Sequence, residues 1–465
     1  MKWITGILLL FLVSNLWASD HSKYIKGPFK TPQDVTKQCL TCHENSAKEI
    51  MKTTHWTWDT PPVKVPGHKG LHRIGKKQSF NNFCINIQSN WPRCTSCHTG
   101  YGWKDKTFDF GKEENVDCLI CHADPKIYKK NPKGAGYPKK TVDLLAAAKS
   151  VGEDFPNRQN CGSCHFYGGG GENVKHGDLE GLLAHPSRDV DVHMGSGMVC
   201  QDCHVHDHHQ FIGRGSSVSV SDSSHLHCED CHGLAPHEDE RINFHVRTVA
   251  CQTCHIPTYA KGKATKIWWD WSKAGMDIKP EEEYGRETFM KKKGEFHWGK
   301  NLRPEYVWYN GKMERYLIGD TFDPKKVLYI NKPMGSVHDS HAKIYPFKVM
   351  RGKQIYDAKY NYLIVPHLWG GYWKYFDWDR AAREGMEVVG LPYSGHYGFV
   401  ETKMYWRINH EVVPKEKALR CVDCHGKNGR MDWEALGYDG DPMQMGDRKQ
   451  EGLIKEYSQP ESKSK

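Results

Sequence analysis

Hydrophobic residues gather at the start of the chain and are sparse after it. The first twenty residues, MKWITGILLLFLVSNLWASD, carry a positive charge at Lys2, an apolar run from Trp3 to Val13 and a small residue at Ala18. This order is typical of a secretory signal peptide, and the run is shorter than the roughly 20 apolar residues that span a bilayer. We therefore expect export to the periplasm and no transmembrane segment in the mature protein. An uncleaved amphipathic anchor is the alternative.

Two later segments have helical patterns, TVDLLAAAKSVG (141–152) and DWDRAAREGMEVVG (377–390), and the second ends at Gly390. The stretch 256–400 is rich in aromatic residues, as in KIWWDWSK and HLWGGYWKYFDW, which we expect to pack rather than to form a binding box. Its alternating pieces EYVWYNG and KMERYLIG predict a small sheet. The predicted class is mainly α, with much irregular structure and a small β component.

The composition is poor in apolar residues for a chain of this length. Of the 465 residues, 38% are hydrophobic, and the mean hydropathy is -0.72. A chain this long has on average about three domains of ~150 residues, each needing an apolar core. Apolar surface is therefore expected from outside the polypeptide, as a large bound cofactor would supply it.

The sequence C-x-x-C-H occurs eight times and uses sixteen of the seventeen cysteines, leaving Cys84 outside the motifs. Two thiols at this spacing add to the two vinyl groups of one haem, and the adjacent histidine can bind its iron. The motifs predict eight haem c groups and a multihaem cytochrome c fold organised around them. The residues are Cys39, Cys42 and His43; Cys94, Cys97 and His98; Cys118, Cys121 and His122; Cys161, Cys164 and His165; Cys200, Cys203 and His204; Cys228, Cys231 and His232; Cys251, Cys254 and His255; and Cys421, Cys424 and His425.

Disulfides and zinc ribbons are the alternatives for so many cysteine pairs in an exported protein. Neither explains why a histidine follows every second cysteine. Each ferric haem with two ionised propionates adds about one negative charge, so eight would offset most of the formal charge of +9. The basic balance therefore gives no support for nucleic-acid binding.

Seven motifs lie close together and the eighth lies far downstream. We expect a signal peptide at 1–18, a seven-haem region at 19–255, a haem-free aromatic region at 256–400, an eighth-haem region at 401–450 and a disordered tail at 451–465. The short gaps between motifs favour closely packed haems that form one electron-conducting chain.

Each iron needs a second axial ligand for fast electron transfer, and histidines outside the motifs can supply it. The cluster VHDHHQ (205–210) is expected to give at most one ligand. The stronger candidates by local context are His55, His193, His225, His245 and His410, and the weaker ones are His185, His237 and His396.

Two residues suggest chemistry beyond electron transfer. Cys84 lies ten residues before the second motif, and Lys175 follows four glycines in CGSCHFYGGGGENVKH, close to Glu172. A neutral lysine amine can bind iron in a dry site. From the residues alone, a buried structural cysteine and a solvated loop lysine remain open alternatives.

The chain resembles the octahaem tetrathionate reductase family of periplasmic cytochromes c. The likeness covers most of the mature chain and includes NNFC followed by PRCTSCHTGYGW, GGGGENVKHGDL, HVRTVACQTCHIP, and ALRCVDCHG followed by DWEALGYDGDP. It implies a catalytic second haem at Cys94, Cys97 and His98, with Lys175 as its sixth ligand. It also implies that Cys84 and an acid lie in the pocket; the family's acid is an aspartate, and here it is Glu172, one methylene longer.

The resemblance implies two-electron reduction of tetrathionate to thiosulfate, and possible substrates also include nitrite and hydroxylamine. The implied donor is a periplasmic cytochrome or a quinol dehydrogenase. A Cys84 thiolate could attack the central S–S bond, or a nitrogen substrate could replace Lys175 on the iron. The alternatives are an electron-transfer protein without its own substrate and a hydroxylamine-oxidising octahaem enzyme.

Overall fold

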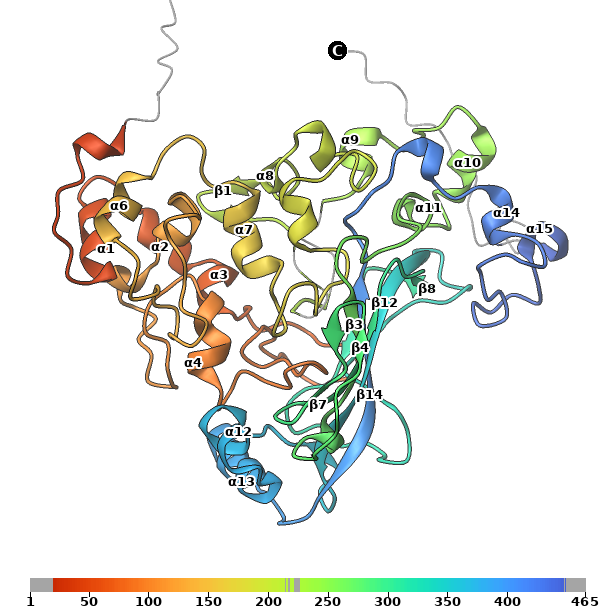
Figure 1. Ribbon diagram of the computed structural model, residues 1–465. Coiled ribbons are helices and arrows are strands. Elements are labelled where there is room, and N and C mark those ends of the chain that lie inside the picture. Colours follow the sequence, from red (N-terminus) through yellow and green to blue (C-terminus); the bar gives the residue numbers. More distant parts are fainter. Residues whose placement is uncertain (1–19, 214, 216–217, 221–225, 447, 449–465) are drawn as a thin grey trace, which may run out of the picture.

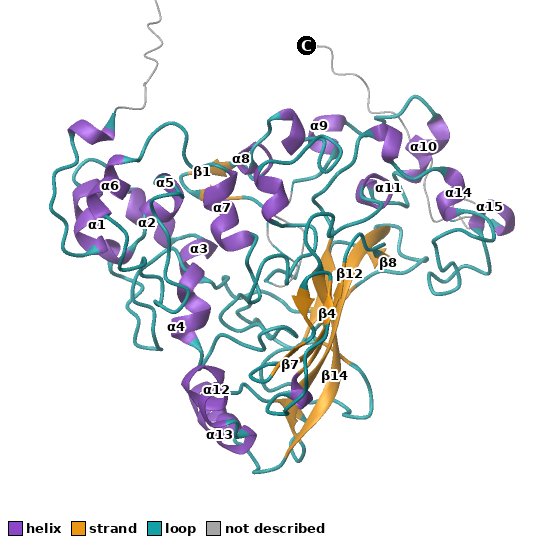
Figure 2. Cartoon of the chain, viewed as in Figure 1, coloured by secondary structure: helices purple, strands orange, loops and turns teal. Residues whose placement is uncertain are grey.

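The computed structural model describes residues 20–213, 215, 218–220, 226–446 and 448. The predicted signal peptide, His225 and the predicted tail at 451–465 lie outside these residues. Short helices joined by long loops make up the first half of the chain, and a sheet makes up much of the second half (Figures 1 and 2). No helix of the described ranges is long and apolar enough to cross a membrane.

The helices are short. The α-helices are α1 Pro32–Leu40, α2 Ser46–Met51, α3 Thr54–Thr57, α4 Trp91–Cys94, α5 Leu119–His122, α6 Leu144–Lys149, α7 Arg158–His165, α8 Cys200–Cys203, α9 Glu229–His232, α10 Glu240–His245, α11 Cys251–His255, α12 Trp373–Tyr375, α13 Trp378–Val389, α14 Cys421–Cys424 and α15 Pro442–Met445. The 3₁₀ turns are η1 His21–Lys23, η2 Thr95–Cys97, η3 Glu113–Asn115, η4 Gly181–Ala184, η5 Met194–Ser196, η6 Trp271–Lys273 and η8 Lys415–Lys417, and a π-helical turn, η7, spans Leu368–Tyr372.

Most strands belong to one eight-stranded sheet with the order β10-β14-β12-β3-β7-β6, in which β8 and β13 also pair with β12. The strands are β1 His206–Asp207, β2 Gln210–Phe211, β3 Thr265–Asp270, β4 Glu282–Glu283, β5 Arg286–Glu287, β6 Phe289–Met290, β7 Gly294–Gly299, β8 Glu305–Tyr309, β9 Met313–Arg315, β10 Leu328–Tyr329, β11 Asn331–Pro333, β12 Lys343–Asp357, β13 Tyr362–Leu363 and β14 Tyr397–Arg407.

The centre of the sheet is the antiparallel pair of β12 and β14, in register from Phe347 opposite Arg407 to Asp357 opposite Tyr397. On its other side β12 runs parallel to β3, and β3 is antiparallel to β7. The sheet is therefore built from segments that are far apart in sequence. Its longest strands, β12 and β14, extend through the core of the molecule.

The main hydrophobic core lies on this sheet and extends to the haem-attachment half. Trp269 and Trp271 stack with ring centroids 4.9 Å apart, and the helix α13 packs its alanine face on the same core. Phe83, next to Cys84, and Val174, next to Lys175, are buried in this core as well. The sheet thus fixes the positions of two loops that carry predicted site residues.

The sequence-based elements are confirmed where their signals were strongest. The segment 377–390 forms α13, with Asp377 accepting from the backbone of Arg380 and Gly390 ending the helix at a φ of 72°. The segment 141–152 contains α6, which Asp143 caps. EYVWYNG contains β8 of the large sheet, and KMERYLIG contains β9, which pairs with β11 in a separate sheet. The predicted class, helices with much irregular structure and a β component, is confirmed.

Candidate metal centres and active site

The eight C-x-x-C-H sequences fold into short helical turns. The turn directs both thiols and the imidazole to one side, because residues three and four apart share a helix face. In several motifs the backbone N–H of the histidine donates to the carbonyl of the first cysteine over 2.8 to 3.1 Å, at His43, His122, His204, His232 and His425. All seventeen cysteines lie in the described ranges as free thiols.

Seven motif histidines face a second histidine ring. The ring centroids are 5.9 to 6.4 Å apart, whereas interplanar angles vary from 20° to 84°. The pairs are His43–His21, His122–His209, His165–His55, His204–His410, His232–His193, His255–His237 and His425–His245.

This separation fits an iron between the two rings. Two metal–nitrogen bonds of about 2 Å, with about 1 Å from each nitrogen to its ring centre, give about 6 Å between centroids. The angle between the rings is free in such an arrangement, because both rings rotate about the ligand axis. The residues present therefore fit bis-histidine haems at seven sites.

Hydrogen bonds at the far nitrogen hold several of these rings in place. Nδ1 of His410 pairs with Asp178 at 3.1 Å, Nδ1 of His425 pairs with Asp441 at 2.6 Å, and Nδ1 of His204 faces the carbonyl of Ile212 at 3.0 Å. A bond at Nδ1 leaves Nε2 available to the metal and fixes the ring orientation. Desolvation alone would lower the pKa of His410, but the hydrogen bond to Asp178 and the negative charge of that carboxylate raise it.

Five of the eight histidines predicted as second ligands stand opposite a motif histidine: His55, His193, His237, His245 and His410. His185 instead contacts Gln159, and His396 is exposed at the start of β14. The other two opposing rings belong to His21 and His209, which the sequence analysis did not select. His209 comes from the VHDHHQ cluster, from which one ligand was expected; His21 has no local signal in the sequence.

The second motif differs from the others in its backbone. His98 donates its backbone N–H to Thr95, three residues earlier, whereas the five histidines named above donate to a residue four positions earlier. Its side chain is fully buried, and Nε2 lies 2.6 Å from the carbonyl oxygen of Trp56. This is the opposite nitrogen from the one that is hydrogen bonded in His204, His410 and His425.

Aromatic rings surround His98 on several sides. Centroids lie 5.0 Å away at Trp56, 4.9 Å at Trp103 and 5.5 Å at Phe108. Burial among them lowers the pKa of His98 to about 3, so the ring is neutral. None of the described histidines faces it across a 6 Å gap. This is not the arrangement expected of the iron ligand that was predicted at His98.

The glycine loop, residues 166–177, runs between this motif and the sheet. Gly169 and Gly170 have φ values of 81° and 99°, which residues with a Cβ rarely adopt. The loop is fixed at its far end by Lys348 of β12, whose buried amine donates to the carbonyls of Val174 and Lys175. The sheet therefore sets the position of the backbone at Lys175.

Lys175 is partly buried, and its side chain packs along Gly168 and Gly169. Its Nζ lies 5.0 Å from the ring centre of Trp406. Burial, followed by the nearby charge of Lys76, lowers the pKa of Lys175 to about 7, while Cys97 of the second motif acts in the opposite direction. The amine therefore lies within electrostatic reach of the second attachment site and loses its proton easily.

Cys84 meets the same loop from the other side. Its thiol donates to the carbonyl of Gly169 over 3.3 Å, and its backbone N–H is held by Asn81. Burial raises the pKa of Cys84, whereas the charges of Lys293 and Lys266 oppose that rise. Cys84 also affects the pKa of Cys94 in the second motif. The structure thus brings Cys84, Lys175 and the second motif together.

Glu172 points elsewhere. Its carboxylate faces Gly181, where an added Cβ would lie 2.4 Å from Oε1, and it influences the pKa values of Arg286 and Glu180. The family resemblance implies that Glu172 lies in the same pocket as Lys175. The turn of the loop at Asn173, whose φ is 56°, sends the two side chains in different directions.

Contacts between thiols of different motifs show how the attachment sites are connected. Thioether formation would place a porphyrin edge at each sulfur, so such a contact brings two porphyrin edges together. The first site touches the third, the second touches the fourth, the fourth touches the fifth, and the sixth touches the seventh, through Cys39–Cys118, Cys97–Cys164, Cys161–Cys200 and Cys228–Cys251.

Electrostatic effects between further cysteines indicate the remaining links. They join the third site to the fourth, the fifth to the sixth and the seventh to the eighth, through Cys121–Cys161, Cys203–Cys231 and Cys254–Cys424. With haems bound at these cysteines, seven sites would lie in one line and the second site would lie beside the fourth.

Comparison with known proteins agrees with this arrangement. A family model described as bacterial cytochrome c matches residues 266–428. The crystal structure of an octahaem cytochrome c from Shewanella oneidensis is similar, with 52% sequence identity and a TM-score of 0.87, over 92% of this chain and 98% of that chain. An uncharacterised protein of Archaeoglobus fulgidus is 26% identical over 241 residues, 41% of this chain and 80% of that protein.

Proposed function

Because the chain belongs to the octahaem cytochromes c and its motifs resemble those of the octahaem tetrathionate reductase family, we propose that it reduces tetrathionate at its second attachment site. The observation that carries the proposal is the meeting of Cys84 and Lys175 at Gly169, beside the one motif whose histidine faces no second histidine in the described structure. The other seven sites have the paired imidazoles of electron-transfer haems.

Lys175 is the protein ligand of the second haem in this proposal, and His98 is not. The amine is close to neutral and near Cys97, whereas Nε2 of His98 is already bonded to the carbonyl of Trp56. This modifies the expectation from the sequence, in which His98 and Lys175 both bind the iron of the second haem. A haem c bound there supplies single electrons and a coordination position open to a small molecule.

Cys84 gives a route for the sulfur substrate. Its thiolate attacks one central sulfur of tetrathionate, forming a Cys84–S–SO₃⁻ mixed disulfide and releasing one thiosulfate. Two electrons then cleave that disulfide, restoring the thiolate and releasing the second thiosulfate. The sum is one tetrathionate dianion plus two electrons giving two thiosulfate dianions, without net proton uptake.

The thiol must lose its proton before it attacks. Burial lowers the pKa of Lys266 well below its usual value, and this amine and the Cys84 thiol influence each other's titration. A neutral amine can accept a proton from a neighbouring thiol. Lys266 is therefore the proposed base, and the resulting ammonium stabilises the thiolate.

Nitrite and hydroxylamine are proposed as further substrates, because they could bind the open position without any thiol. This gives a clear test with the purified holoprotein and an artificial electron donor. Cys84→Ser is expected to lower kcat/KM for tetrathionate by at least about 100-fold and to change nitrite reduction by less than about threefold.

Full haem content in the variant serves as the control for correct assembly. Equal loss of both activities would count against attack by the thiolate. Wild-type protein that reduces none of the three substrates would instead identify it as an electron carrier.

Export and the electron donor are proposals as well. The signal peptide predicted at 1–18 would deliver the chain to the periplasm, the usual place of c-type cytochromes. A periplasmic cytochrome or a quinol dehydrogenase would then supply electrons to the line of haems.

A further inference from the structure

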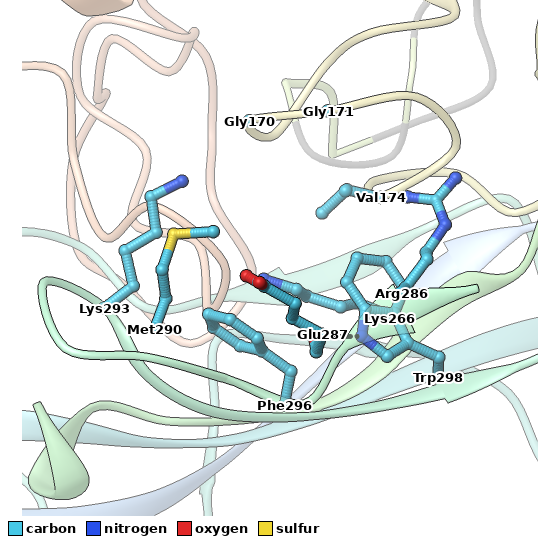
Figure 3. Close-up of a pocket in the computed structure, with 10 residues that line it drawn as sticks. All are labelled: Gly170, Gly171, Val174, Lys266, Arg286, Glu287, Met290, Lys293, Phe296 and Trp298. Carbon is cyan, nitrogen blue, oxygen red and sulfur yellow. Dashed lines mark hydrogen bonds between the residues drawn. The ribbon is translucent and has the colours of Figure 1, made fainter. Parts of the chain in front are cut away.

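A cavity of about 230 Å³ lies under the glycine loop (Figure 3). Gly170 and Gly171 form its upper wall, and β7 with Phe296 and Trp298 forms its floor. Glu287 and Met290 at its edge are exposed, so the cavity opens to solvent. Its volume corresponds to about eight waters, or a bonded anion of about ten non-hydrogen atoms.

Three basic side chains line this cavity: Lys266, Arg286 and Lys293. Lys266 is 4% exposed, and its Nζ lies over Phe296 at 3.1 Å and over Trp269 at 3.5 Å from the ring centroids. Arg286 lies over Trp298 at 4.6 Å. Among the described residues none of the three forms an ion pair, so their charges are not neutralised by a carboxylate.

The lining charge suits an anion with two negative charges. With Lys266 neutral, Arg286, Lys293 and the single acid Glu287 sum to +1, and the sum becomes +2 once Lys266 has accepted the proton of Cys84. Aromatic faces hold a cation in place but leave its N–H groups free to bind oxygen atoms. A buried cation without a partner is costly, and a bound oxyanion removes that cost.

Gly170 lies between this cavity and Cys84, and it has no side chain to fill the space there. An added Cβ at Gly170 would lie 3.5 Å from Sγ of Cys84 and 3.9 Å from Nζ of Lys293. A side chain at this position would therefore fill the space between the thiol and the amine. With glycine there, one end of a long anion can rest on the cations while its middle reaches the thiol.

We propose that this cavity is a binding site for a sulfonate-bearing sulfur dianion, held by Lys266, Arg286 and Lys293, and that it selects dianions over smaller or uncharged substrates. The site deepens the proposed function and rests on it for the role of Cys84. It also predicts a property independent of turnover, since a dianion that is not reduced should bind there.

Thiosulfate is the probe for that property. Its dissociation constant for the oxidised holoprotein is measured by titration calorimetry in the wild type, in Arg286→Gln and in Lys293→Gln. Each variant is expected to bind thiosulfate at least about tenfold more weakly. Lys292→Gln is the matched control, because it removes the same charge from an exposed neighbour that does not line the cavity.

Steady-state kinetics provide the second readout. Both cavity variants should raise KM for tetrathionate about tenfold with kcat nearly constant, and should raise KM for nitrite less. KM for hydroxylamine, which is uncharged at neutral pH, should not change.

Thiosulfate affinity that is unchanged in both cavity variants would overturn the proposal, as would equal changes of KM for all three substrates. Weaker thiosulfate binding in a protein that does not reduce tetrathionate would support the cavity site and reject the proposed function. The two proposals therefore fail separately.

Discussion

His98 differs from histidines at the other sites in which ring nitrogen is free of a hydrogen bond, and Lys175 supplies an amine where the other sites have a second imidazole. At His204, His410 and His425 a hydrogen bond occupies Nδ1, whereas at His98 it occupies Nε2. Lys175 offers an amine whose pKa of about 7 makes the neutral form accessible. In the proposed arrangement, one exchanged hydrogen bond and one lysine would make the second haem chemically distinct from the other seven.

Lys175→Met tests this difference directly. Because Lys175 is proposed to bind only the second iron, its loss should change the low-temperature paramagnetic spectrum of one ferric haem and leave seven unchanged. Turnover of tetrathionate and nitrite should fall by at least about tenfold.

Lys76→Met is the matched control, since its amine lies 3.6 Å above the Trp58 ring in the same region. It should leave the spectrum as in the wild type. An unaltered spectrum in Lys175→Met would place the amine away from iron and remove the basis of the proposed site.

At the scale of elements, the strand β12 connects the sheet to the site. Lys348 in its middle holds the backbone of Val174 and Lys175, and Asp357 at its end holds the turn before β14. The carboxylate of Asp357 accepts from Ser394, Lys359 and Tyr360 at 2.7 to 2.9 Å. Hydrogen bonds therefore hold β12 to its neighbours at two places, at Lys348 beside the glycine loop and at Asp357 before β14.

The Asp357 contacts give a pH-dependent stability. Burial alone would raise the pKa of Asp357, but its donors outweigh burial and lower it. A lowered folded-state pKa stabilises the fold above the unfolded value of about 3.9, and this stabilisation is lost as pH falls through the folded pKa. Asp357→Asn should cost about 1 to 3 kcal/mol at pH 7.

Thermal unfolding followed by far-UV circular dichroism measures this cost. The difference in transition temperature between the wild type and Asp357→Asn should shrink below about pH 4. Asp323→Asn, at an exposed turn where Asp323 accepts from Lys325, should change stability by less than about 0.5 kcal/mol. A pH-independent difference would show that charge on Asp357 does not matter.

Elements with local signals could be predicted from the sequence. Asp377 and Gly390 mark both ends of α13, and the C-x-x-C-H spacing defines every attachment turn. The pairing of β3 with β12 could not be read, because it joins strands more than seventy residues apart in a parallel arrangement. Cys84 and Lys175 both lie against Gly169, as the resemblance implies, whereas Glu172 lies against Gly181, on the other side of Asn173 and its left-handed backbone.

At the scale of the molecule, neighbouring cysteines place the attachment sites in a line with one branch. With haems bound, the proximity of Cys97 and Cys164 would make the fourth site the neighbour that delivers electrons to the second. The ligands of these sites were harder to predict than the attachments. His21 and His209 reach their partners through tertiary folding, and no spacing in the sequence reports that distance.

His55→Met tests the branch point. A methionine ligand raises the potential of the fourth haem and should slow electron delivery to the second site. Turnover with tetrathionate and with nitrite should then fall by the same factor, so that their ratio stays constant. Cys84→Ser, by contrast, should change that ratio.

His185→Gln is the control, because His185 contacts Gln159 rather than a motif histidine. It should leave both rates unchanged. A change in the substrate ratio for His55→Met would mean that the fourth site takes part in the chemistry rather than in electron delivery alone.

The proposed pocket has walls from both halves of the chain: the glycine loop from the haem-attachment half, and Lys266, Arg286 and Lys293 from the sheet half. Neither half forms the proposed pocket by itself. A relative that has the cysteine motifs without the sheet is therefore expected to lack the proposed anion site, whatever the number of its haem-attachment motifs.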